Sequence, residues 1–239
     1  MAAPRKKTRD MTQGTIWKHL LAFALPLMIG NLFQQLYNTV DSIVVGQFVS
    51  KQALAAVGST TSIINMLVGF FSGVSVGAGV IISQRFGAKD PEGVHKAVHT
   101  TISLTLIIGL IGTVVGIVLA PIMLTLMKTP QDVFVEAKAY LQIYFGGISG
   151  LMLYNMGSGI LRAVGDSRRP LYFLVFSSCV NIVLDLLFVL GFHMGVEGVA
   201  LATILSQGIS AVLVILALFR ADNCIQLRLR WLKIHWDLL

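Results

Sequence analysis

The sequence predicts an all-α, polytopic membrane protein, and three observations support this fold class. Apolar residues make up 55% of the 239 residues and charged residues only 12%, whereas about a quarter of the residues in soluble domains are charged. The mean hydropathy is +0.80. Apolar runs long enough to cross a bilayer recur along the whole chain, and no separate soluble domain is visible between them.

Six transmembrane helices are predicted when about 20 residues are taken as the spanning length. They are expected at about Ile16–Phe48, Ala53–Gln84, Val94–Met127, Val133–Arg162, Pro170–Phe192 and Val196–Phe219. Several exceed the spanning length, so we expect tilts or kinks, with Pro26 and Pro121 as kink points. Pro170 lies instead where a helix begins, a position that its ring favours. Residues 16–219 are therefore predicted to form one six-helix bundle.

The two ends of the chain are predicted to be cytoplasmic. Residues 1–15 form a basic tail, since the apolar stretch that follows is too long and too polar for a signal-peptide core. Residues 220–239 interleave Trp231 and Trp236 with basic side chains, which predicts an amphipathic linker or tail on the inner leaflet.

The distribution of positive charge predicts the orientation. All of the 18 lysine and arginine residues except Lys51, Lys128 and Lys138 fall on one side of the predicted topology. Because cytoplasmic loops carry the excess of such residues, we expect a multi-pass protein of the cell membrane with both termini in the cytoplasm. The net charge of +7 is then explained by topology, and we expect no nucleic-acid partner.

Two carboxylates lie well within the predicted helices, Asp41 and Asp185. Each costs about 2.5–3.5 kcal/mol near the bilayer centre unless it faces water or binds a proton or a cation. Helical periodicity places further polar residues on the same faces. They are Asn31, Gln34 and Asn38 beside Asp41, and Ser177, Ser178 and Asn181 beside Asp185.

These polar faces have two interpretations. They can serve as hydrogen-bonding contacts between helices, which explains the amides but has no need of two carboxylates. Alternatively, they line a water-accessible cavity whose carboxylates take up protons or, with amide and hydroxyl oxygens, bind a hard cation such as Na⁺. We favour the cavity, and the residue types do not discriminate between H⁺ and Na⁺.

Glycines at GxxxG spacing predict close helix packing. Gly69, Gly73 and Gly77 form a double motif in the second helix. Single motifs follow at Gly112/Gly116 and Gly146/Gly150.

Four segments resemble a known transporter family. They are ALPLMIGNLFQQLYNTVDSIVVGQF in the first helix, ALAAVGSTTSI at the start of the second, the loop GILRAVGDSRRP, and VEGVALATILSQ in the sixth helix. From about Thr12 to Leu239 the chain resembles the multidrug and toxic compound extrusion (MATE) transporters, in particular the bacterial branch related to DNA-damage-inducible F proteins.

The resemblance implies a secondary active antiporter of the cell inner membrane, active in multidrug efflux. Such proteins export small organic, often cationic, compounds in exchange for H⁺ or Na⁺ and need no other cofactor. They contain twelve helices in two six-helix lobes, and this chain matches only the amino-terminal lobe. It is therefore expected to be a truncated reading frame, a partial sequence, or a half-transporter that pairs with a second copy of itself.

The resemblance also implies the site residues. The proton or cation site, and any Na⁺ site, would comprise Asp41, Asn181, Asp185 and Thr203. Residues expected at the substrate cavity are Gln34, Tyr37, Asn38, Met152 and Asn155. For Tyr37 and Met152, packing in the core is an equal alternative.

Three rival functions were weighed. An intramembrane aspartyl protease is disfavoured, because Asp166 lies in a loop and Asp185 lacks the expected GxG context; no enzymatic activity is expected. A lipid-linked oligosaccharide flippase of the same superfamily would need cationic residues in its cavity, and no Lys or Arg lies deep in the predicted helices. A structural or non-transporting membrane subunit would have no use for the two carboxylates.

Overall fold

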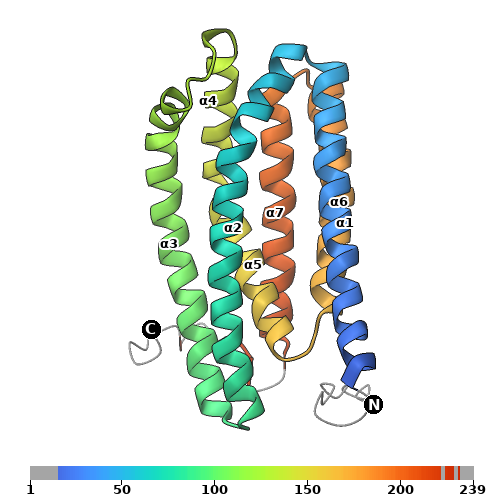
Figure 1. Ribbon diagram of the computed structural model, residues 1–239, viewed down its shortest axis with the longest axis vertical. Coiled ribbons are helices and arrows are strands. Elements are labelled where there is room, and N and C mark those ends of the chain that lie inside the picture. The colour runs from blue at the N-terminus through green and yellow to red at the C-terminus, as the bar shows by residue number, and fades with distance from the viewer. Residues whose placement is uncertain (1–15, 222–223, 229–230, 232–239) are drawn as a thin grey trace.

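The computed structural model describes residues 16–221, 224–228 and 231, which form a bundle of helices without a strand among them (Figure 1). This confirms the all-α prediction. In chain order the helices are α1 (Ile16–Phe48), α2 (Lys51–Gly87), α3 (Pro91–Leu126), α4 (Gln131–Gly146), α5 (Ile148–Ala163), α6 (Arg168–Leu186), the π-helical turn η1 (Leu187–Gly191) and α7 (Gly195–Phe219).

The predicted fourth helix, Val133–Arg162, is wrong as a single element, because the chain breaks at Gly147 into α4 and α5. Gly147 lies against Ile204 of α7, and a Cβ atom at this position would overlap the Ile204 side chain. The absence of a side chain at Gly147 therefore lets α7 approach the backbone closely. In Figure 1, α4 occupies the upper half of the bundle and α5 the lower half, so the two short helices together complete one crossing.

The other predicted helices agree with the structure to within a few residues. α1 has the predicted bounds, and α1 and α3 continue as helices through Pro26 and Pro121. The predicted fifth helix changes from α6 into η1 directly after Asp185 and Leu186. π-helical turns are uncommon and occur frequently at functional sites. The chain then turns into α7 through Gly195, whose φ of 61° suits glycine.

Five helical segments are long and apolar enough to cross a membrane: α1, α2, α3, α6 continued by η1, and α7. α4 and α5 have 16 residues each, short of the roughly 20 needed for a crossing. The outer surface is apolar, as Leu110, Val118 and Leu126 of α3 illustrate with 67%, 63% and 77% of their area exposed. Such a surface fits lipid as the surrounding solvent.

One end of the bundle is rich in basic residues. It holds the start of α1, the end of α7, and the turns between α2 and α3 and between α5 and α6 (Figure 1). We call it the basic end; among its residues are Arg85, Lys89, Arg162, Arg168 and Arg169. Lys51, the first residue of α2, and Lys128, in the turn after α3, lie at the opposite end.

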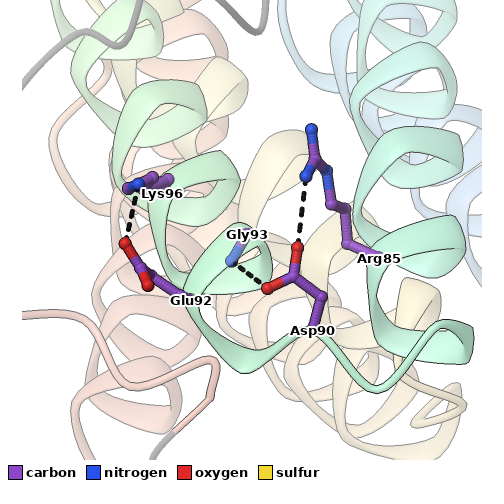
Figure 2. A network of polar contacts seen from close by, with 5 residues as sticks. All are labelled: Arg85, Asp90, Glu92, Gly93 and Lys96. Atoms are coloured by element: carbon purple, nitrogen blue, oxygen red, sulfur yellow. Dashed lines mark hydrogen bonds and ion pairs between the residues drawn. The ribbon is translucent and has the colours of Figure 1, made fainter.

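The turn between α2 and α3 is fixed by Asp90, as Figure 2 shows. Asp90 Oδ1 accepts a hydrogen bond from the Gly93 N–H at 2.9 Å, which caps α3, and Oδ2 accepts from Arg85 Nη1 at 3.1 Å. These two donors hold the pKa of Asp90 below its usual range. One helical turn further, Lys96 pairs with Glu92 at 2.7 Å.

The glycine motifs do not all mediate packing. A Cβ atom at Gly69, Gly73 or Gly77 would meet no described atom within 4 Å, so close packing at this double motif is wrong within the described bundle. Gly116, by contrast, lies against the ring of Phe145, and Gly150 lies against the backbone of Gly208. The predicted close approach is therefore confirmed for one glycine of each single motif, whereas a Cβ atom at Gly112 or Gly146 would meet no described atom within 4 Å.

Part of the C-terminal segment packs on the basic end. Ile225 and Leu227 are buried in a hydrophobic cluster with residues of α3, α5 and α7. The Arg228 N–H donates a hydrogen bond to His99 Nε2 at 3.0 Å. Trp231 lies edge-on to the ring of His95. Trp236 lies outside the described residues, so the predicted amphipathic segment is described only in part.

Candidate functional site

Asp41 and Asp185 meet inside the bundle. Asp41 comes from α1 and Asp185 from the last turn of α6, and their side chains are 6% and 0% exposed. α1 packs along α6, so that the two carboxyl groups are close enough to interact electrostatically. The structure therefore brings together the two acidic residues that we had singled out because a carboxylate is costly near the bilayer centre.

Polar atoms around this carboxyl pair lack partners. Asn181 lies one turn before Asp185 and is 1% exposed. Apart from the contact of the two carboxyl groups with each other, Asp41 Oδ1, both carboxyl oxygens of Asp185 and both amide atoms of Asn181 have no hydrogen-bond partner among the described residues. An unpaired buried polar atom costs about 1–3 kcal/mol. This donor and acceptor set suits a proton or a small hard cation.

Thr203 and the two serines on the polar face of α6 form hydrogen bonds within their own helices. Thr203 of α7 is buried, and its Oγ1 donates to the Val199 carbonyl at 3.0 Å. Ser177 and Ser178 both donate to the Leu174 carbonyl. If the polar faces served as hydrogen-bonding contacts between helices, these side chains would bond to another helix. Within the described residues they form no such bond.

Three residues beside the carboxyl pair were missed by sequence reasoning: Tyr140, Tyr144 and Gln207. Both tyrosines are buried on α4, their rings are stacked with centroids 6.5 Å apart, and Tyr140 lies close enough to Asp41 and Asp185 to interact with their charges. Gln207 Nε2 donates to the hydroxyl of Tyr37 at 3.4 Å. The spacing of four residues along α4, and between Thr203 and Gln207 along α7, is the signal that could have revealed them.

A cavity of about 690 Å³ lies between α1, α2, α5 and α6. Gln34 and Asn155, predicted as cavity residues, line it, and so does Pro26. It ends toward the basic end at Arg162 and Ser167. This volume is within the range of about 300–1,000 Å³ found for small-molecule sites.

The other predicted cavity residues lie elsewhere. Met152 is 1% exposed and packs in a hydrophobic cluster with residues of α2, α3 and α4. Asn38 has an exposed side chain outside the cavity lining. Tyr37 is buried behind Gln207, which does line the cavity. Tyr37 therefore lies between the carboxyl pair and the wall of the cavity.

Arg162 changes the expected charge of the cavity. The sequence places this residue at the end of a helix, which led to the expectation of a cavity without cations. In the structure its side chain lines the cavity from the last turn of α5. The described residues contain no cluster of three or more His, Cys, Asp or Glu side chains suited to a metal.

Comparison with known proteins places this architecture among transporters. The MatE family model matches residues 26–187. A protein of Bacillus subtilis named "Probable multidrug resistance protein YpnP" is 37% identical over 204 residues, which cover 85% of this chain and 46% of the relative. The DNA damage-inducible protein F of Escherichia coli is 28% identical over 193 residues, with 80% and 41% covered.

A solved structure described as MATE in the bent conformation superimposes with a TM-score of 0.89 at 29% identity. The match covers 98% of this chain and 52% of that one. The chain thus spans about half the length of the curated relatives and of the solved structure that it matches.

Proposed function

Because this chain belongs to the MatE family, whose members are transporters and not enzymes, we propose that it forms one lobe of a secondary antiporter that exports organic compounds in exchange for H⁺ or Na⁺. The membrane-spanning helices and the relatives named for multidrug resistance support an efflux protein. The assignment of H⁺ or Na⁺ as the driving ion, and of the residues that bind it, is part of what we propose.

The observation that carries the proposal is the buried pair Asp41–Asp185 with its unpartnered oxygens. Two carboxylates in contact within a poorly solvated interior repel each other, and a shared proton or a cation relieves this repulsion. Asn181 supplies a further oxygen, and Thr203 would join the site if its hydroxyl rotated away from the Val199 carbonyl. The pair can therefore load an ion on one side of the membrane and release it on the other.

Coupling to the substrate follows from the position of α1. The same helix carries Asp41 and the cavity residues Pro26 and Gln34. An ion that draws the carboxyl groups of α1 and α6 together would shift the cavity wall, with Pro26 as the bending point. By linkage, a substrate that prefers the other arrangement lowers the affinity for the ion by the same factor.

We place the basic end in the cytoplasm, because the excess of Lys and Arg marks the cytoplasmic side. Alternating access requires a second body against which this lobe moves. That body is a second six-helix lobe or a second copy of this chain.

A lipid-linked oligosaccharide flippase of the same superfamily is the second candidate function. Arg162 at the cavity favours it, because a pyrophosphate group needs a cationic partner. A single arginine gives one such contact, whereas the buried carboxyl pair has no role in flipping. Antiport accounts for both features.

The test is transport by the two-lobe assembly in proteoliposomes. Separate H⁺ and Na⁺ gradients are imposed, and uptake of ethidium into vesicles is recorded by its fluorescence on enclosed DNA. We expect uptake with one of the two gradients in the wild type and none above the empty-vesicle rate in Asp41→Asn. Transport of ethidium by Asp41→Asn at the wild-type rate would refute the coupling role of the pair.

A further inference from the structure

Arg162 is a cation at the cavity that has no partner within the described part of the chain. Its side chain is half-buried in the last turn of α5, and it makes no ion pair or side-chain hydrogen bond with the described residues. Its basic neighbours differ in this respect. Arg85 pairs with Asp90, and Arg169 pairs with Asp166, each at 3.1 Å.

The cavity offers Arg162 no anion. None of the described residues that line it is acidic. Asp166, the closest acidic residue in sequence, is occupied by Arg169, which contacts it through both Nε and the backbone N–H. Tyr154 lies near Arg162, but its hydroxyl donates to the Pro170 carbonyl at 3.2 Å. Among the residues that the structure describes, none therefore compensates the charge of the guanidinium inside the cavity.

The other cavity groups are neutral and polar. Gln34 and Gln207 lie on the walls toward the carboxyl pair. Asn155, whose Nδ2 donates to the Leu151 carbonyl, also lines the cavity. The cavity thus has a cationic end at Arg162 and a neutral, polar wall at Gln34 and Gln207.

We propose that Arg162 is the receptor for an oxyanion, a carboxylate, sulfonate or phosphate, carried by the organic compound that enters this cavity. A guanidinium presents parallel N–H donors that match such a group in a bidentate arrangement. This inference deepens the proposed export function and rests on the cavity being its substrate site. It predicts that, among the compounds that enter the cavity, those with an oxyanion at one end and a neutral or cationic group at the other bind more tightly than matched compounds without the oxyanion.

The same chemistry has a second source in a bilayer, the phosphate of an anionic lipid headgroup. The two sources differ in their response to lipid composition. A headgroup that occupies Arg162 competes with a soluble oxyanion, and the competition depends on the presence of anionic lipid in the membrane.

The experiment uses two dyes that differ in one group. Rhodamine 110 carries a free carboxylate, and rhodamine 123 is its methyl ester. Binding of each dye to the purified chain in phosphatidylcholine nanodiscs is measured by fluorescence anisotropy for the wild type, Arg162→Gln, Arg162→Lys and Arg168→Gln. Arg168 is the matched control, because it is an exposed arginine at the same end and does not line the cavity.

We expect Arg162→Gln to weaken rhodamine 110 binding about tenfold, as for loss of one charge-assisted contact, and to leave rhodamine 123 binding unchanged or tighter. Arg162→Lys keeps the positive charge but lacks the parallel N–H donors of the guanidinium, so it should retain part of the preference for rhodamine 110 over rhodamine 123. This variant tests the proposal even if the glutamine variant does not fold. Arg168→Gln should change neither affinity. Replacing part of the lipid by phosphatidylglycerol should weaken rhodamine 110 binding in the wild type alone if headgroups use the same site.

If Arg162→Gln lowered the affinity for both dyes equally, the proposal would be overturned, because Arg162 would then only stabilise the end of α5. Equal effects of Arg162→Gln and Arg168→Gln, or failure of the wild type to prefer rhodamine 110, would overturn it as well. None of these outcomes bears on ion-driven transport of ethidium, so each proposal can be refuted without the other.

Discussion

The carboxyl groups of Asp41 on α1 and Asp185 on α6 are buried neighbours inside a helical bundle whose outer surface is apolar. Apart from the Asp41 carboxyl group, the Asp185 oxygens have no hydrogen-bond partner among the described residues. Such an arrangement opposes stability, because each ionised carboxylate costs about 2.5–3.5 kcal/mol in a bilayer interior. Proteins retain destabilising groups of this kind where function requires them.

Asp185→Asn should therefore stabilise the protein. The amide has nearly the shape of the carboxylate and removes one of the two adjacent negative charges. At mildly alkaline pH we expect the Tm in detergent to rise by a few degrees, measured by the unfolding of the purified protein. Asp132→Asn is the control, because Asp132 is an exposed residue of the first turn of α4; there the Tm should stay unchanged or fall slightly through the helix dipole. A lower Tm for Asp185→Asn than for wild type would argue against repulsion within the pair.

The two kinds of glycine should respond differently to alanine. Gly116→Ala forces its new methyl group against the buried ring of Phe145 and should cost about 1–3 kcal/mol. Gly73→Ala meets open space within the described bundle and should leave the free energy of unfolding unchanged or raise it by up to about 1 kcal/mol, because alanine has the higher helix propensity. Thermal unfolding of both variants in detergent measures the difference. Destabilisation of equal size would mean that α2 is packed in a way the described bundle does not contain.

Stability should depend on pH through Asp90 at the basic end. The Gly93 N–H and the Arg85 guanidinium lower the pKa of Asp90 in the folded state. Its ionised form therefore contributes fully above the unfolded value of about 3.9, and the contribution is lost as the pH falls through the lower folded value. Asp90→Ala should lower the Tm by a few degrees at neutral pH, and the gap to wild type should close in strong acid. A gap of the same size at both pH values would assign the loss to packing.

His99 should hold the C-terminal segment on the bundle. His99→Phe preserves the buried ring but removes the Nε2 acceptor of the Arg228 N–H. Loss of a hydrogen bond worth about 0.5–1.5 kcal/mol predicts roughly 2- to 12-fold faster trypsin cleavage after Arg228. Cleavage after Arg168, an exposed residue at the start of α6, is the internal control. An unchanged rate after Arg228 would show that the buried Ile225 and Leu227 suffice to hold the segment.

Hydropathy and periodicity predicted most of this fold, because lipid imposes simple rules on composition and length. The bounds of α1, and the placement of Asp41 and Asp185 away from lipid, follow from these rules. The water-accessible cavity expected at the two carboxylates does not: both are buried, and neither lines the cavity. The close approach of Ile204 to Gly147 could not be foreseen, because Ile204 lies on α7 and is distant in sequence. Residues that meet only in the folded bundle, such as Tyr37 and Gln207, were likewise out of reach.

The sequence did not place Arg162 at the cavity and left Met152 open between the cavity and the core, for one physical reason. Periodicity tells which residues share a helix face, but not which neighbour covers that face. Met152 faces other helices and is covered completely, whereas Arg162 faces the space enclosed by α1, α2 and α6.

The central claim is that ion and substrate binding are linked through Asp41 and Asp185. The most direct measurement is the number of protons or Na⁺ ions displaced when ethidium binds to the purified two-lobe assembly, recorded in weak buffer with a pH-sensitive dye and, in parallel, with ²²Na⁺. The account predicts displacement of one kind of ion by the wild type, and ethidium binding without displacement by Asp41→Asn. Displacement by Asp41→Asn equal to that by the wild type would contradict it.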